Sequence, residues 1–254
     1  MRSLVSLVTI TLLGLQSQVA AAERVKIETD RAIVYFDSGA LARTKMEEFA
    51  GLADRGVRDI EAFLRRGPGG TAFGTRRITF YVSDEVGISR AKRHSVMLPL
   101  TRVRRDEAPY LHEATHVLVP GRSEMVWLNE GFASYVESWV AENKGGYDAH
   151  VFSRGGNGGI DRDAARHLRT GHGQSALDYV GTAGVPRGFY RDRRRVAAPF
   201  YVLSQSFVKF LVERSGLHLV VDLCGERDVG QAVRTRTGRS IGEWKADWLA
   251  ELPR

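Results

Sequence analysis

The sequence of 254 residues contains a single cysteine, Cys224, so no disulfide can form within the chain. A small fold stapled by disulfides is therefore excluded, and zinc bound by several cysteines is not expected. Cys224 follows Val220, Val221 and Leu223, which is the setting of a small buried hydrophobic residue. We assign it no function.

Long apolar runs are also lacking beyond the N-terminus, so no transmembrane segment is expected in the mature chain. At the N-terminus, Arg2 precedes an apolar run from Leu4 to Leu15, and small residues at 19–22 suit a signal peptidase. No cysteine follows to accept a lipid anchor. We predict a signal peptide at 1–22 and a secreted or periplasmic protein, with an uncleaved anchor as the alternative.

Recognisable nucleic-acid-binding modules are absent, so nucleic acid is not an expected partner despite the net charge of +7. Most of this charge lies in a stretch at 143–196, which has nine Arg and one Lys against five Asp, a net +5, and eleven of the 27 Gly. Such a stretch can attract an anionic substrate or an anionic envelope surface. The stretch departs from the helical regularity around it, and the alternative is a solvated, partly mobile insertion between helices.

After the predicted signal peptide, residues 23–254 are enough for a single domain built of two lobes. The apolar patterns predict an α/β lobe at 23–106 and a mainly helical lobe at 107–254 that contains the insertion at 143–196. The predicted strands lie within 25–38 as a pair, at 77–82 and, as a short edge strand, at 95–100. The predicted helices lie at 41–64 with a break near Gly56, and at about 107–118, 127–142, 198–213 and 241–252.

The segment His112-Glu113-Ala114-Thr115-His116 has the HExxH pattern in a region predicted to be helical. At 3.6 residues per turn, His112 and His116 project from one face and can bind one metal ion. Glu113 would then lie beside a metal-bound water as a general base. The alternative is an exposed helix whose two histidines face solvent.

A zinc site with two histidines needs a third protein ligand. The metzincin pattern is excluded, because Val119 stands where that pattern has Gly and Arg122 where it has the third His. The remaining possibility for the third ligand is a Glu from a following helix. Glu130 in WLNEGFASY is such a residue, after a short loop.

WLNEGFASY after HExxH resembles the gluzincin peptidases, in particular the aminopeptidase N and leukotriene hydrolase group and the compact peptidase MA-like proteins. The resemblance implies His112, His116 and Glu130 as ligands of Zn²⁺ and Glu113 as the general base. It also implies an α+β, two-lobe gluzincin-like (zincin) fold, with an N-terminal mixed sheet, a mainly helical lobe and the zinc site in the cleft. In gluzincins an edge strand often pairs with an extended substrate, and the strand at 96–100 is the candidate here.

Three further residues are weaker candidates for a role at the predicted zinc site. Glu137 lies two helical turns after Glu130 and can accept a hydrogen bond from a ligand His, or it is a solvated carboxylate. Tyr201 resembles the oxyanion-stabilising Tyr of the MA-like proteins, with a core aromatic as the alternative and Tyr190 as the reserve candidate. The neighbouring Phe residues of the 198–213 helix are expected in the core.

These observations predict an exported zinc metallopeptidase that acts on a peptide or protein substrate. Residues 89–105 contain no acidic residue, whereas the large aminopeptidases have an acidic motif on the edge strand that holds the free N-terminus. We therefore expect an endopeptidase rather than an aminopeptidase. The alternative is a non-catalytic envelope protein of gluzincin fold that binds an anionic polymer through its basic insertion.

Overall fold

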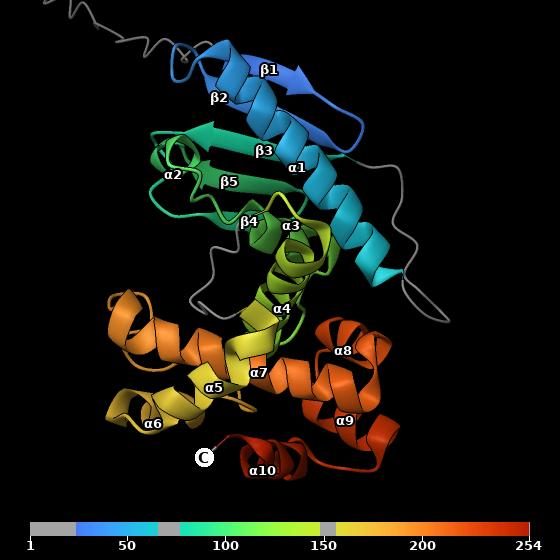
Figure 1. The fold of residues 1–254 in the computed structure, drawn as a ribbon. Helices are drawn as coiled ribbons and strands as arrows, with labels where there is room; N and C mark the ends of the chain where they lie inside the picture. Colours follow the sequence, from blue (N-terminus) through green and yellow to red (C-terminus); the bar gives the residue numbers. More distant parts are fainter. Residues whose placement is uncertain (1–23, 66–76, 148–155, 254) are drawn as a thin grey trace, which may run out of the picture.

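The computed structural model describes residues 24–65, 77–147 and 156–253. A five-stranded sheet and a long helix form one part, and a set of helices forms the other (Figure 1). The predicted signal peptide at 1–22 lies outside the described residues. Within them, no helix combines the length and the apolar character that a membrane span requires.

The first part contains all five strands. They are β1 (Arg24–Glu28), β2 (Ala32–Asp37), β3 (Ile78–Ser83), β4 (Arg90–Lys92) and β5 (Ser95–Pro99), with α1 (Arg43–Leu64) between β2 and β3 and the short α2 (Leu100–Arg104) after β5. The strand order is β1-β2-β3-β5-β4, in which the three central strands are parallel and both outer strands antiparallel. This confirms the expected mixed sheet.

Alternation of side chains explains why the central strands form and how α1 covers them. Every second residue of β2, from Ala32 to Phe36, is buried, and so are Ile78 and Phe80 of β3. This face of the sheet packs against α1, which crosses it diagonally (Figure 1). Because successive strand residues point to opposite faces, the pattern defines a single buried face.

The predicted break in the first helix is wrong, since α1 is continuous from Arg43 to Leu64. Gly56 has a packing role instead. A Cβ on Gly56 would lie 2.6 Å from Leu111 Cδ2 and 3.2 Å from Tyr110 Cε2, so the glycine lets α1 approach the helix at 110–118 closely.

The predicted edge strand is also misassigned. Residues 95–99 do form a strand, β5, but β4 pairs with it from Ser95 to Met97, so β4 is the edge of the sheet. The three residues of β4 are too few to show alternating apolar and polar side chains. The turn after them contains Arg93 at a positive φ of 51°. A strand this short leaves no periodic signal in the sequence.

The second part is helical, as predicted. Its elements are α3 (Tyr110–Leu118), α4 (Val126–Lys144), α5 (Gly156–Leu168), α6 (Gly171–Leu177), the π-helical turn η1 (Arg193–Ala197), α7 (Ala198–Ser215), α8 (Leu217–Cys224), α9 (Val229–Thr237) and α10 (Ile241–Glu251). In Figure 1, α3 and α4 lie between the sheet and the other helices. The core prediction for α7 is confirmed, because Phe200, Leu203, Phe207 and Phe210 are all buried.

The stretch at 143–196 is more regular than its composition indicated. Its described part includes α5 and α6, and α5 packs against α7 through Ile160 and Ala164, which are buried. Asp161 of α5 accepts hydrogen bonds from Ser206 Oγ (2.7 Å) and Lys209 Nζ (2.8 Å) of α7. The expectation of an irregular insertion is therefore wrong for 156–177. The buried face of α5 includes glycine and alanine, so its sequence shows only a weak helical pattern of large apolar residues.

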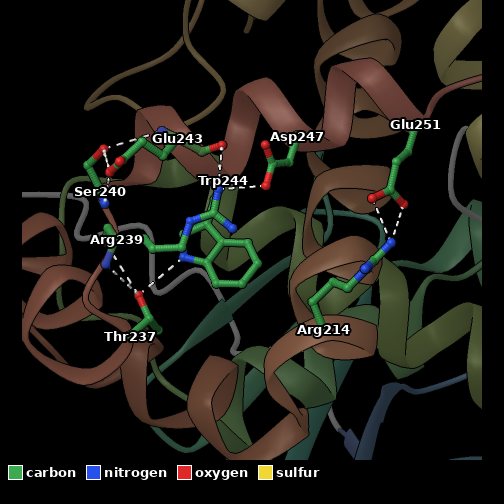
Figure 2. A network of polar contacts seen from close by, with 8 residues as sticks. All are labelled: Arg214, Thr237, Arg239, Ser240, Glu243, Trp244, Asp247 and Glu251. Atoms are coloured by element: carbon green, nitrogen blue, oxygen red, sulfur yellow. Dashed lines mark hydrogen bonds and ion pairs between the residues drawn. The ribbon is translucent and has the colours of Figure 1, made fainter.

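The closing helix, predicted at 241–252, is α10, and Figure 2 shows the contacts that hold it. Ser240 caps it, since its Oγ accepts from the backbone N–H of Glu243 while the Glu243 carboxylate accepts from the Ser240 backbone N–H. At the other end, Arg214 of α7 donates to both carboxylate oxygens of Glu251 at 2.6 Å. The Arg214–Glu251 contact joins α10 to α7, and a hydrogen bond from Trp244 Nε1 to Thr237 Oγ1 (3.2 Å) joins it to α9.

Candidate metal centre

Two consecutive helices bring the HExxH and NEG residues together. Helix α3 starts directly after Pro109, and His112 and His116 lie one turn apart on it. After the loop at 119–125, α4 starts, and Glu130 lies in its second turn. The α3 and α4 helices pack against one another, which directs Glu130 toward the two imidazoles.

The three side chains converge on one point. His112 Nε2 lies 3.1 Å from His116 Nε2 and 3.1 Å from Glu130 Oε2, and His116 Nε2 lies 3.6 Å from the same oxygen. Tetrahedral ligand atoms at about 2.0–2.1 Å from a zinc ion lie about 3.3 Å from each other. The spacing of these donor atoms therefore fits a tetrahedral zinc ion. No other group of this kind occurs among residues 24–65, 77–147 and 156–253.

Electrostatics around His112 also suit a cation. Burial by itself would lower the pKa of His112, but its hydrogen bond with Glu130 and the charges of Glu130, Glu113 and Glu137 raise that pKa to about 9. Burial would raise the pKa of Glu130, yet His116 and His112 hold it well below its usual value. Three carboxylates thus surround two imidazoles, and a positive charge among them is strongly favoured.

Glu113 is buried and lies on α3 beside the two histidines. Burial raises the pKa of its carboxyl group, and the nearby His112 and His116 act in the opposite direction. The backbone N–H of Ala91, on the edge strand β4, donates a hydrogen bond to this carboxylate. A base with a raised pKa is better matched to proton transfer near neutral pH.

Glu137 is completely buried on α4, so the alternative of a solvated helix carboxylate is wrong. Its Oε2 lies 4.0 Å from His112 Nδ1, the ring nitrogen that points away from Glu130. A carboxylate on the far nitrogen of a ligand imidazole fixes the tautomer of the ring. At 4.0 Å the two atoms form an ion-pair contact rather than a hydrogen bond, and the charge of Glu137 raises the pKa of His112.

Tyr201, in the first turn of α7, lies at this site. Its ring centroid is 6.0 Å from that of His112, and its hydroxyl donates a hydrogen bond to Glu130. Burial, followed by the charge of Glu130, raises the pKa of Tyr201, so the hydroxyl keeps its proton. The reserve candidate, Tyr190, is 80% exposed and contacts the ring of Phe189 at 5.0 Å.

Sequence reasoning missed two contributors to the site, Ala91 of β4 and Arg102 of α2. Ala91 acts through its backbone, which no motif can reveal. Burial lowers the pKa of Arg102, and the charges of Glu107, Glu137 and Glu113 act in the opposite direction; the residue lies on a five-residue helix that the sequence did not predict.

Comparison with known proteins gives no sequence match, either to a protein family or to a curated protein. Solved structures do match. The chain is similar to an M1 zinc metallopeptidase from Deinococcus radiodurans, with 18% identity, a TM-score of 0.51, and coverage of 91% of this chain and 52% of that one. A mutant of that enzyme bound to a Tyr-Ser-Ala substrate matches with 17% identity, a TM-score of 0.52 and coverage of 91% and 52%. The fold is that of the M1 zinc metallopeptidases.

The match to the M1 structures confirms the expected α+β fold, with its N-terminal mixed sheet and mainly helical second part. The chain spans about half the length of the M1 structures that it matches. Its His-His-Glu group, which can hold a metal ion, is compatible with the zinc chemistry of the M1 neighbours.

Proposed function

We propose that this chain is a zinc-dependent peptidase, in which His112, His116 and Glu130 bind Zn²⁺ and Glu113 is the general base. The observation that supports this most directly is the convergence of the three donor atoms, with mutual distances of 3.1–3.6 Å, in a chain of M1 fold. A third protein ligand leaves one tetrahedral position for water or substrate.

When bound, zinc supplies a Lewis acid that polarises the scissile carbonyl and brings the pKa of a coordinated water to about 7. Glu113 accepts the proton of the attacking water and then passes it to the leaving amine. Its hydrogen bond from the Ala91 N–H fixes the carboxylate on the β4 side of the site. Tyr201, which keeps its proton, exchanges its hydrogen bond with Glu130 for one to the oxyanion.

We further propose that the enzyme is an endopeptidase rather than an aminopeptidase. The segment from β4 to the end of α2 lies within 89–105 and contains no acidic side chain that would bind a free α-amino group. Blocking the N-terminus of a peptide substrate is therefore expected to leave kcat/KM nearly unchanged. A strict preference for free N-termini would contradict this proposal.

The alternative of a non-catalytic binding protein is less favoured. A protein that retained the fold only for binding would have no need of Glu113, yet this residue is present together with all three ligand residues. Export by a signal peptide at 1–22 is part of the proposal, and N-terminal sequencing of the protein recovered outside the cytoplasm tests it.

The decisive experiment combines metal analysis with a peptide-library digest read by mass spectrometry. We expect about one zinc per chain and cleavage of N-terminally blocked peptides. Glu113→Gln should keep the zinc and lose roughly 10²–10⁴-fold in rate, because only the proton transfer is removed. The matched control is Glu124→Gln, an exposed carboxylate on the loop between α3 and α4. A wild-type protein without zinc, or cleavage that survives Glu113→Gln, would overturn the proposal.

A further inference from the structure

A pocket of about 440 Å³ lies between α5 and the segment that follows α10. All but one of its lining residues belong to α5 or directly follow it, and the exception is Pro253. Among these described lining residues, none belongs to α3, α4 or α7, the helices of the candidate metal centre. Figure 1 shows α5 and α10 on the side of the helical part that faces away from the sheet. The pocket is therefore separate from the metal centre.

Hydrogen bonds hold the backbone on both sides of this pocket in place. Ser206 Oγ of α7 donates to Asp161 Oδ1 of α5 (2.7 Å) and accepts from Trp248 Nε1 of α10 (2.9 Å). Ser206 and Trp248 are buried. Helices α5 and α10 are thus joined through one residue of α7, which fixes the position of Pro253 relative to α5.

Gly159 forms the floor of the pocket. The residue is buried, yet a Cβ added to it would meet no neighbouring atom within 4 Å. Its backbone does not have the positive φ that favours glycine, and glycine inside a helix is destabilising relative to alanine. Neither the backbone conformation nor helix stability explains this glycine, whereas the hollow that it leaves is part of the pocket.

Three arginines surround this hollow. Arg162, Arg166 and Arg169 follow one another at spacings of four and three residues, so they project from one face of α5 and its last turn. The one acidic lining residue, Asp163, forms an ion pair with Arg166. Arg162 and Arg169 are exposed, and neither forms an ion pair or a side-chain hydrogen bond with a described residue. Two guanidinium groups are therefore left without a counter-charge at the pocket.

The helix dipole accounts for only part of this arrangement. Cations near the C-terminus of a helix are favoured by its dipole, which explains Arg166 and Arg169. It explains neither Arg162, which lies in the middle of α5, nor the hollow over Gly159. A pocket whose floor is glycine and whose rim has unpaired guanidinium groups is suited to an anion.

We propose that this pocket binds the phosphate group of a phosphate monoester. Guanidinium groups pair with phosphate oxygens in a bidentate manner. A phosphate monoester has three acceptor oxygens and a charge of about −2 near neutral pH, which matches two unpaired guanidinium groups better than the single charge of a carboxylate. Pockets for small ligands have volumes of about 300–1,000 Å³, so the organic part of the ester also has room. The ester is either a free small molecule or the headgroup of a phospholipid.

Two binding measurements on the purified protein separate these sources. Calorimetric titration uses glucose 6-phosphate, with glucose and glucuronate as the neutral and carboxylate controls. Cosedimentation uses phosphatidylcholine vesicles with and without phosphatidic acid, whose headgroup is also a phosphate monoester. We expect at least one ester to bind about tenfold or more tightly than its controls, as hydrogen bonds to charged groups contribute. The ester that binds identifies the source, and binding of neither overturns the proposal.

Variants of the unpaired arginines test the assignment of the site. Arg162→Gln and Arg169→Gln should each weaken binding of the ester by roughly tenfold to a hundredfold. Arg191→Gln and Arg194→Gln are the matched controls, because they remove the same charge from exposed positions outside the pocket. An equal loss in these controls would mean that only the overall positive charge attracts the ester, and would overturn the proposal.

Filling the hollow tests the pocket without changing its charge. Gly159→Leu should abolish binding, whereas Gly158→Leu should not, because Gly158 is the exposed neighbour on the same helix and also has no atom within 4 Å of an added Cβ. Thermal unfolding verifies that both variants fold. Binding that survives in folded Gly159→Leu contradicts the pocket, and the arginine variants decide if that variant does not fold.

A last variant keeps this outcome independent of the proposed peptidase function. His116→Ala removes a candidate metal ligand and should bind the ester as wild type does, because no element of the metal centre lines the pocket. Binding that is lost in His116→Ala would assign the ester to the metal centre and overturn the proposal.

Discussion

Gly131 lies directly against the backbone carbonyl of Ser204, and a Cβ at Gly131 would be 2.5 Å from that oxygen. This is the closest approach that α4 could make to α7 at this point, because a side chain would force the two helices apart. Gly131 is the residue after Glu130, and Ser204 lies about one turn after Tyr201. The glycine therefore brings Tyr201 of α7 within hydrogen-bonding distance of Glu130.

Gly131→Ala is accordingly expected to lower the free energy of unfolding by about 1–3 kcal/mol, the usual cost of overpacking. It should also reduce activity beyond its effect on stability, since Tyr201 moves away from Glu130. Urea unfolding measures the first effect. Gly158→Ala is the control: Gly158 lies in α5 with nothing within 4 Å of its added Cβ, so that variant should be neutral or slightly stabilising. Equal stability of the two variants would contradict the close approach.

Removing one ligand should abolish tight metal binding. His116→Ala is expected to lose zinc during dialysis, and its melting temperature should not rise on addition of zinc, whereas that of wild type should, because a ligand bound only to the folded state stabilises it. Atomic emission and thermal shift measure the two effects. His172→Ala, at an exposed histidine of α6, should behave as wild type. Retention of zinc by His116→Ala would show that the ligand set is wrong.

Zinc binding should release a proton. The pKa of His112 in the metal-free protein is raised to about 9, so at pH 7 this imidazole holds a proton that zinc must displace. Zinc affinity should therefore rise about tenfold per pH unit as the pH increases toward that value. Titrations against a competing chelator between pH 6 and pH 8.5 measure it.

Glu137 supplies the control for this effect, because its charge is one of the causes of the raised pKa of His112. Glu137→Gln should lower that pKa and flatten the pH dependence of zinc affinity. Zinc affinity in wild type that does not change between pH 6 and pH 8.5 would contradict the prediction.

The cap of α10 offers a test away from the site. Ser240→Ala removes the side-chain acceptor of the capping box and should cost about 1 kcal/mol of stability. Ser240→Asp, which keeps an acceptor at the N-cap, should restore most of it. Chemical denaturation compares the three proteins. Activity should be unaffected, because the residues in Figure 2 lie on α7, α9, α10 and the turn between α9 and α10, and not on α3 or α4. A cost as large for Ser240→Asp as for Ser240→Ala would exclude the capping role.

The long strands and helices could be predicted from the sequence, because burial of one face makes apolar residues recur at the spacing of a strand or a helix. The strand at 78–83 and the helices at 110–118, 126–144 and 198–215 all carry that signal. The convergence of His112, His116 and Glu130 follows the spacing of two motifs on adjacent helices. By contrast, β4 is too short to show a period, and α5 is packed largely through small residues.

Arg102 could not be found from the sequence for a different reason. Its neighbours Thr101 and Val103 form no motif with it, and the electrostatic effect of Glu113 on it depends on how the chain folds between α2 and α3. The structural role of Gly56 could likewise not be determined from the sequence. A glycine within a helical pattern can mark a break or a close contact, and only the packing of α1 on α3 decides between them.

The two outer strands have a consequence for how the protein meets other chains. Strand β1 exposes Arg24, Lys26 and Glu28 along its length, and β4 exposes Arg90 and Lys92 in only three residues. Charged or very short edges discourage strand-to-strand association and so guard against aggregation. Under the proposed function, a peptide aligned along β4 would likewise gain few main-chain hydrogen bonds, so its selection would depend on its side chains.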